Sequence, residues 1–269
     1  MRWDWYSATV PEAPEAVLGA LCAAQDLAGV YPTKGLYSYD RGAQVKRGER
    51  LFATCYWGGV NGDESTHVQA SGQDTPWVVS QLRQHWPAHR VSRADVCEDY
   101  TGPMTWDRLL ALALSVADEH RIKTNTVGDW IKGEDGRTLY LGGRTSIARA
   151  RVYEKGIQVG HDRDWVRAEL QVRPTGDGKS ALCAIEPAAV FGATPWTLDL
   201  AERLGVPEIQ AIRVRDPWRA TDDERALSFM LKQYGPLLER QAVEHGGWDR
   251  LGLFMGAERD AAVKKSQCH

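Results

Sequence analysis

The order strand, helix and further strands occurs twice within the first 192 residues of this chain of 269 residues. In the first occurrence a strand and a helix precede three β-like segments and a second helix, at residues 2–10, 11–29, 36–48, 50–59, 65–74 and 75–86. The second occurrence follows at residues 89–100, 104–121, 127–133, 137–144, 146–156, 164–174 and 179–192. Because strands joined by short turns pair as antiparallel neighbours, the sequence predicts an α+β fold. We expect an antiparallel-rich sheet built from two βαβββ-like halves, as in an RRM-like or ferredoxin-like duplication, with helices at the C-terminus.

The pattern changes after residue 192, where two helical segments follow at 194–205 and 222–247. The last residues, KKSQCH, are polar and carry no helical periodicity. We therefore expect a catalytic domain at 1–192 with halves 1–88 and 89–192, a C-terminal helical subdomain at 193–262 and a flexible tail at 263–269.

Composition narrows the class of protein. No apolar run approaches the roughly 18 residues that a membrane span needs, and the N-terminus lacks the apolar stretch of a signal peptide. The five cysteines are scattered, without a C-x-x-C pair, which favours free thiols. We expect a soluble protein of the cytoplasm, or of the host cytoplasm if a phage encodes it, with no membrane partner.

Charge is distributed unevenly along the chain. The formal net charge of −3 does not indicate a nucleic-acid binder. Between Arg137 and Arg173, however, eight basic residues stand against four acidic ones, a local excess of +4. This basic stretch coincides with the strongest strand signals of the second half.

Two tyrosines lie within that stretch. Tyr140 and Tyr153 fall on successive strands, and Glu169 falls on the next strand, so pairing of the three strands places them in one region. By alternation, Arg149, Arg151, Tyr153 and Lys155 share one strand face. A tyrosine with its ordinary pKa of about 10 is a poor nucleophile unless cations stabilise the phenolate, and these cations are the right kind. The alternative is that Tyr153 is an ordinary amphipathic strand residue, which is the commoner case.

Carboxylates form a second candidate group. Asp95 and Asp99 share a face of the strand at 89–100, and together with Glu169 they are candidate ligands for Mg²⁺ or Mn²⁺, which bind carboxylate oxygens. The alternative is ordinary pairing, of Arg93 with Asp99 or of Arg167 with Glu169. His67 lies on an expected strand. It is a candidate third metal ligand, but the commoner alternative is a solvated strand histidine.

The segment TLYLGGRTSIARARVYEKG, followed by DWVRAELQVR, resembles the signature of the trans-acting replication initiation proteins of rolling-circle plasmids and filamentous phages. The matching blocks are Tyr140-Leu141-Gly142, Gly143-Arg144-Thr145-Ser146, Arg151-Val152-Tyr153-Glu154-Lys155 and Trp165-Val166-Arg167-Ala168-Glu169. The upstream Arg93-Ala94-Asp95 matches the Arg-x-Asp strand of the family. A departure is the C-terminal segment ERQAVEHGGWDRLG, which is nearly balanced in charge where plasmid members carry a basic segment.

The resemblance implies roles for these positions. Tyr153 would attack a DNA phosphate, with Tyr140 as the second candidate, and Lys155 would steady the transition state. Asp95, Glu169 and Asp99 would hold a divalent metal, Mg²⁺ or Mn²⁺. The expected DNA contacts are Arg144, Arg149, Arg151 and Arg167.

The function implied is that of a rolling-circle replication initiator. Such a protein nicks and religates one strand of a single-stranded or cruciform origin through a 5′-phosphotyrosine intermediate. Because the chain has no G-x-x-x-x-G-K-[ST] loop, a host helicase and polymerase are expected partners, and a homodimer would supply a second tyrosine. The alternatives are a non-catalytic DNA-binding regulator of the same fold and a metal-dependent nuclease that uses water.

Overall fold

The computed structural model describes residues 1–61, 64–132, 134–161, 164–206, 209–214 and 222–266. It divides into two compact units, Met1–Asp216 and Pro217–His269. We treat each unit by itself.

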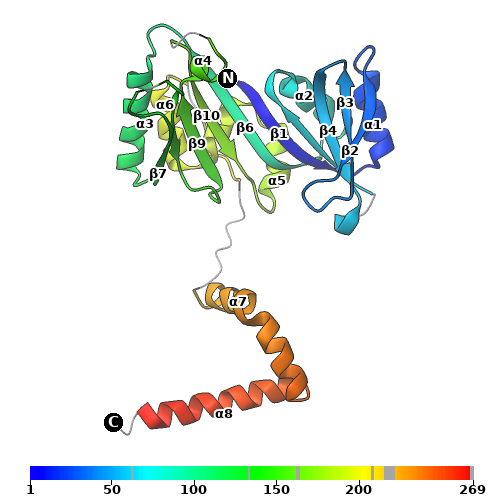
Figure 1. Ribbon diagram of the computed structural model, residues 1–269, viewed down its shortest axis with the longest axis vertical. Helices are drawn as coiled ribbons and strands as arrows, with labels where there is room; N and C mark the ends of the chain where they lie inside the picture. Colours follow the sequence, from blue (N-terminus) through cyan, green and yellow to red (C-terminus); the bar gives the residue numbers. More distant parts are fainter. Residues whose placement is uncertain (62–63, 133, 162–163, 207–208, 215–221, 267–269) are drawn as a thin grey trace. The chain divides into compact units, whose positions relative to one another are not determined.

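The first unit is built on one large antiparallel sheet. Over the described residues, ten strands pair in the order β2-β3-β4-β5-β1-β6-β10-β9-β8-β7. Their bounds are β1 Arg2–Val10, β2 Gly29–Lys34, β3 Arg41–Arg47, β4 Arg50–Trp57, β5 Thr66–Ser71, β6 Arg90–Tyr100, β7 Thr124–Gly128, β8 Arg137–Leu141, β9 Ala148–Tyr153 and β10 Val166–Val172. Figure 1 shows β1 and β6 side by side in the middle of this unit.

The strand order is that of a duplication. Starting from β1 and moving outward, the first half runs β5, β4, β3 and β2, and starting from β6 the second half runs β10, β9, β8 and β7. Each half therefore has the same path, and the two halves meet where β1 pairs antiparallel with β6. The predicted α+β fold with two equivalent halves is confirmed.

One strand of the first half was missed. Apart from Gly29, β2 lies between the helix expected at 11–29 and the strand expected at 36–48, and α1 (Pro14–Ala23) ends earlier than that helix. Leu27, within the helix expected at 11–29, is 92% exposed and has a positive φ of 61°. Because β2 is an edge strand with little burial, its sequence lacks the alternation that marks the inner strands.

Helices cover one face of the sheet. α1, α2 (Thr75–His85) and α3 (Trp106–Glu119) bury apolar side chains in a single core with the strands. The strands contribute alternate residues to this core, which in the second half include Leu139, Leu141, Ala150, Val152, Ala168 and Leu170. The residues between them point to the opposite face, which we call the open face. It carries the polar candidates.

The first unit extends beyond the boundary expected at 192. Short helical turns occupy α4 (Lys155–Gln158), α5 (Gly178–Ala181), Leu182–Ala184 and Ala188–Ala193. α6 (Pro195–Arg203), assigned above to the C-terminal helical subdomain, begins at a capping box between Thr194 and Thr197. Its Trp196 and Leu200 are buried in the core of the sheet, so α6 is part of the first unit.

The second unit is helical. α7 spans Asp222–Glu244, with Pro236 inside it, and α8 spans Trp248–Ser266. The tail expected at 263–269 is thus helical as far as Ser266, and the remaining positions lie outside the described residues. Among the helices described, none is both long and apolar enough to cross a membrane.

Candidate active site

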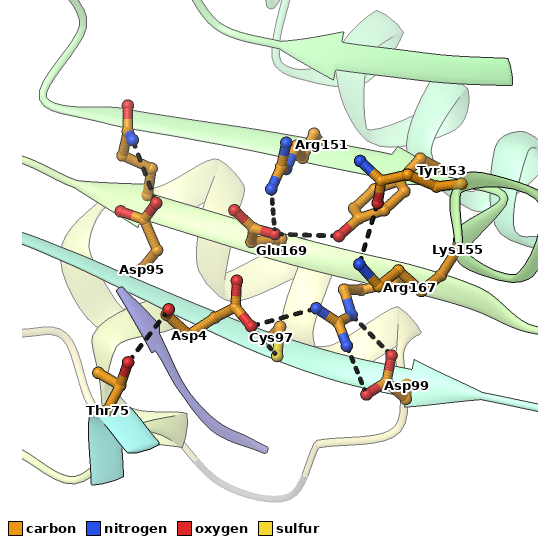
Figure 2. A network of polar contacts seen from close by, with 12 residues as sticks. Asp4, Thr75, Asp95, Cys97, Asp99, Arg151, Tyr153, Lys155, Arg167 and Glu169 are labelled. Atoms are coloured by element: carbon orange, nitrogen blue, oxygen red, sulfur yellow. Dashed lines mark hydrogen bonds and ion pairs between the residues drawn. The ribbon is translucent and has the colours of Figure 1, made fainter. Parts of the chain in front are cut away.

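The strands of the second half bring the expected tyrosines and Glu169 together on the open face. Arg151 on β9 pairs in register with Tyr140 on β8 and with Glu169 on β10. Tyr153 follows two residues after Arg151 and therefore points to the same face. Figure 2 shows Arg151 and Tyr153 both pointing at Glu169.

Glu169 joins these two side chains through one oxygen. Arg151 Nη2 donates to Glu169 Oε2 over 2.7 Å, and the Tyr153 hydroxyl donates to the same oxygen over 3.3 Å. The side chain of Glu169 is only 4% exposed. Burial raises its pKa above the ordinary 4.5, and the neighbouring Arg151 opposes that rise. Glu169 is thus a buried carboxylate that pairs with Arg151 and accepts a hydrogen bond from Tyr153.

Tyr153 is the more enclosed of the two tyrosines. Its residue exposure is 4%, and the Arg151 guanidinium lies 4.8 Å from its ring centroid. Burial, followed by the negative charge of Glu169, raises the pKa of Tyr153 well above 10. Lys155, expected to steady the transition state, lies 5.8 Å from the same ring at the start of α4.

Tyr140 lies beside a cavity of about 250 Å³. The cavity is lined by Arg93, Tyr140, Arg144, Arg149, Ala150, Arg151, Glu169, Gln171 and Arg173, so that five guanidiniums share it with a single carboxylate. The Arg149 guanidinium stacks 3.9 Å from the Tyr140 ring centroid. At about 30 Å³ per water, the volume holds roughly eight waters, which is ample room for a phosphate group.

Two of these arginines carry unpaired buried atoms. Among the residues that the structure describes, Arg149 Nε and Arg151 Nε are shielded from solvent and have no hydrogen-bond partner. Burial lowers the pKa of Arg149, and the guanidiniums of Arg144 and Arg173 lower it further. A buried donor without an acceptor is costly, and like charges held together repel. The cavity is therefore suited to an anion that accepts several hydrogen bonds.

Arg167, an expected DNA contact, is instead enclosed by carboxylates. Its side chain is 4% exposed; it donates to Asp99 over 2.6 and 2.9 Å and to Asp4 over 3.1 Å. Hydrogen bonds from Arg167 and Arg2, acting against partial burial, lower the pKa of Asp99 to about 2. Figure 2 shows Arg167 between Asp4 and Asp99, so its donors are directed into the protein.

Asp4 was not identified from the sequence. It lies on β1, 163 residues from Arg167 along the chain, and its carboxylate also accepts from Cys97 Sγ. Its charge acts to raise the pKa of Tyr153 and of Glu169. No local motif surrounds it, and its place in the site follows only from the pairing of β1 with β6.

Asp95 is engaged by its own neighbours. Arg93 Nε donates to Asp95 Oδ1 over 2.9 Å and Gln171 Nε2 donates to Oδ2 over 3.2 Å. The carboxylate is 1% exposed, and burial raises its pKa against the effect of Arg93. Arg93 also covers the ring of Trp5, at 4.4 Å from its centroid.

The three expected metal ligands are therefore all paired with arginine. Asp95 pairs with Arg93, Asp99 with Arg167, and Glu169 with Arg151. Within the described part of the chain, no group of three His, Cys, Asp or Glu side chains is placed to hold a metal ion. The residues as arranged do not fit a metal site, so we derive no step of the mechanism through a metal. The alternative of arginine pairing describes these carboxylates, although with different partners from those that the sequence suggested.

His67 is not solvated. It is 9% exposed and lies among tyrosine rings on β5. Burial, followed by the charge of Lys179, lowers its pKa to about 4. It contributes to no metal cluster among the residues described.

The open face thus presents tyrosines beside a cationic cavity on an antiparallel sheet. Residues 90–179 match the family model described as replication initiation factor. Within this stretch the chain is similar to that family. The match covers β6 to α5, and therefore contains both tyrosines and the arginine cavity.

A solved structure shares the fold. The rolling circle replication initiator protein from Geobacillus stearothermophilus is 18% identical, with a TM-score of 0.54 over 83% of this chain and 89% of that chain. The di-domain ARO/CYC StfQ from the steffimycin biosynthetic pathway is 10% identical over 75% of this chain and 91% of that chain. Its TM-score is 0.15, which does not indicate a shared fold. Comparison with curated proteins gave no match.

Proposed function

We propose that this protein nicks and rejoins one strand of a replication origin, with a tyrosine attacking a phosphate held in the arginine cavity. The observation that carries this proposal is the cavity itself, in which five guanidiniums and two unpartnered buried donors stand beside Tyr140 and Glu169. A DNA phosphate bound there accepts hydrogen bonds from the guanidiniums and offsets the repulsion among them.

The reaction conserves a phosphoester bond. The tyrosine oxygen bonds to phosphorus, the bond from phosphorus to the 3′ oxygen breaks, and the released 3′ oxygen takes up a proton. The tyrosine hydroxyl proton leaves to Glu169, which lines the same cavity as Tyr140. The arginines stabilise the charge that develops on the phosphate oxygens. Because the product is a 5′-phosphotyrosine ester, reversal by a 3′ hydroxyl rejoins the strand without another energy source.

The two tyrosines differ in what lies beside them. Tyr153 is the nucleophile that the family resemblance implies first, and its hydroxyl donates to Glu169, a carboxylate that can accept a proton. Tyr140 lines the arginine cavity, whereas Tyr153 does not. Because the nucleophile must reach the phosphate, the cavity favours Tyr140 as the attacking residue, with Tyr153 and Lys155 as its supporting neighbours.

The first unit supplies the catalytic domain in this proposal, including the expected halves 1–88 and 89–192. Its substrate is single-stranded or cruciform origin DNA, contacted by Arg144, Arg149 and Arg151. A host helicase and polymerase extend the released 3′ end in the cytoplasm, and a homodimer brings a second tyrosine. A divalent ion is a family-level expectation, and Asp95, Asp99 and Glu169 would each have to exchange an arginine for it.

One experiment separates the proposal from its rivals. Labelled single-stranded origin DNA is incubated with wild type, Tyr140→Phe and Tyr153→Phe, and analysed under denaturing conditions. We expect a covalent adduct with wild type, its loss in Tyr140→Phe, and retained DNA binding in both variants. Loss of the adduct in Tyr153→Phe alone transfers the attack to Tyr153. Free cleavage without an adduct indicates a nuclease that uses water, and intact bound DNA indicates a non-catalytic regulator.

A further inference from the structure

The first half of the sheet carries a cluster of four rings on its open face, which we call the aromatic cluster: Tyr37, Tyr39, Tyr56 and His67. Tyr39 stacks on His67 at 5.5 Å between centroids and 20° between planes. Tyr37 stands edge-on to Tyr56 at 6.0 Å and 90°. Tyr56 and His67 are buried and form the base, while Tyr37 is 63% exposed.

The duplication places this cluster at the position equivalent to Tyr153. Tyr56 on β4 and His67 on β5 form the last pair of their ladder, as Tyr153 on β9 and Arg167 on β10 form the terminal pair of theirs. β4 stands in the first half where β9 stands in the second. The aromatic cluster thus occupies a second copy of the same place on the same sheet face.

Neutral residues replace the charged ones in this copy. The pair that joins Glu169 to Arg151 in the second half has its equivalent in Gln69 and Thr54. His67, with a pKa of about 4, is uncharged at neutral pH. The chemistry that remains is a set of aromatic faces, which stack on bases without reading their sequence.

The exposed ring is held out by the backbone. Tyr37 and Ser38 both have positive φ, 57° and 68°, a conformation that side chains other than glycine adopt rarely. This turn presents Tyr37 at the surface beside Leu36, which is 52% exposed. Strained backbone that keeps an aromatic ring in solvent is typical of a binding site.

We propose that the aromatic cluster stacks unpaired bases of the same DNA strand whose phosphate lies in the arginine cavity, an inference that rests on the proposed function. Both sites lie on the open face, so one strand can reach both. β5, β1, β6 and β10 separate β4 from β9. Five strand spacings of about 4.8 Å separate these strands by about 24 Å. Along the strands, His67 is level with Arg90 and Arg149 is level with Asp95, an offset of five residues or about 17 Å. The two sites are therefore about 29 Å apart, on the order of four to five nucleotides of extended strand.

The test measures binding with origin oligonucleotides that carry 2-aminopurine, whose fluorescence falls when the base stacks. A long oligonucleotide extends past the nick site on both sides, and two shorter ones are truncated from either end. Wild type is compared with Tyr37→Ala, with Tyr37→Phe, which keeps the ring, and with Leu114→Ala, an exposed apolar residue of α3 on the helix-covered side. Because Tyr37 is largely exposed, the alanine variant should melt as wild type does.

We expect Tyr37→Ala to bind the long oligonucleotide roughly 5- to 100-fold more weakly and to lose the fluorescence change at one base position, since stacking on one aromatic residue contributes that much. Tyr37→Phe and Leu114→Ala should match wild type. The truncation that removes the stacked base should abolish the difference between wild type and Tyr37→Ala. The salt dependence should stay unchanged, because no phosphate contact is removed.

Equal affinity of Tyr37→Ala and wild type for the long oligonucleotide would overturn the stacking site, as would an equal loss on every length. These measurements need no nicking. If the wild type forms no covalent adduct but the fluorescence change is lost in Tyr37→Ala, the proposed function is rejected and the stacking site is kept. Adduct formation with unaltered affinities would reject the stacking site alone.

Discussion

The Tyr153 hydroxyl donates to Glu169 Oε2 over 3.3 Å, and the same oxygen accepts from Arg151 over 2.7 Å. One carboxylate oxygen therefore links the enclosed tyrosine to an arginine that lines the cavity. Tyr140 lies opposite Arg151 on the other side, in register on β8. The proton acceptor and the phosphate-binding group of the proposed reaction thus belong to one connected set of side chains.

Removal of the charge from Glu169 should slow nicking. Glu169→Gln keeps the shape but loses the proton acceptor, and we expect a fall of roughly 10²- to 10⁴-fold in the single-turnover nicking rate. Glu154→Gln is the matched control, because Glu154 is also buried and paired with an arginine, Arg137, outside the cavity.

The pH profile gives a second measurement on the same variant. Glu169 must be ionised to accept a proton, and burial raises its pKa above 4.5. The wild-type nicking rate should therefore fall as the pH drops to the raised pKa of Glu169, above 4.5. This fall on the acid side of the pH profile should be absent from Glu169→Gln. An identical acid limb in both proteins would assign the proton acceptor to another group.

The arginines of the cavity should differ in their contribution to the salt dependence of binding. Arg149→Ala removes a cation that stacks on Tyr140 and, among the residues that the structure describes, forms no ion pair with a carboxylate, so the salt slope for single-stranded DNA should fall by roughly 0.7–0.9. Arg151→Ala also uncovers Glu169, which repels phosphate, so its affinity should fall further. Arg137→Ala, whose guanidinium is bound by Glu154, serves as control. An unchanged slope in Arg149→Ala would move the DNA path away from the cavity.

Alternation along single strands predicted much of the site. It placed Arg149, Arg151 and Tyr153 on one face, and the order of elements gave Glu169 its place beside them. Alternation does not predict contacts between strands that are distant in the sequence. Asp4 reaches Arg167 only because β1 pairs with β6, and the two halves meet at that pair. The sequence suggested that each carboxylate pairs with an arginine of its own strand, such as Arg167 with Glu169. In the structure Glu169 instead pairs with Arg151 of the neighbouring strand.

The burial of His67 shows the same limit. A histidine on a strand at the surface and one under two tyrosines look alike in the sequence. Tyr37 and Tyr39 lie in a turn that the sequence assigned to a strand at 36–48, and they cover His67 because the backbone there has positive φ. Local propensity does not predict such a turn, since only the surrounding fold stabilises it.

Arginine pairing should limit metal binding in the absence of DNA. We expect Mg²⁺ or Mn²⁺ to raise the melting temperature of Arg151→Ala more than that of wild type, because Glu169 then lacks its cation. Arg137→Ala, which uncovers Glu154 instead, is the matched variant. A larger metal-induced shift in wild type than in Arg151→Ala would show that the ion binds without displacing this arginine.

Asp99 should stabilise the fold through Arg167. Asp99→Asn removes the charge that accepts two hydrogen bonds from a guanidinium with 4% exposure. We expect a loss of about 2–3 kcal/mol in the free energy of unfolding at neutral pH, less than for a fully buried pair, because Asp99 is partly exposed and Asp4 still accepts from Arg167. The pKa of Asp99 is lowered from 3.8 to about 2, so its contribution is complete above 3.8 and is lost as pH falls toward 2. Urea unfolding of both proteins should show their difference shrinking over that interval, whereas Asp118→Asn, an exposed carboxylate of α3, should match wild type throughout. A difference that stays constant down to the lowest pH would mean that the aspartate acts through packing and not through its charge.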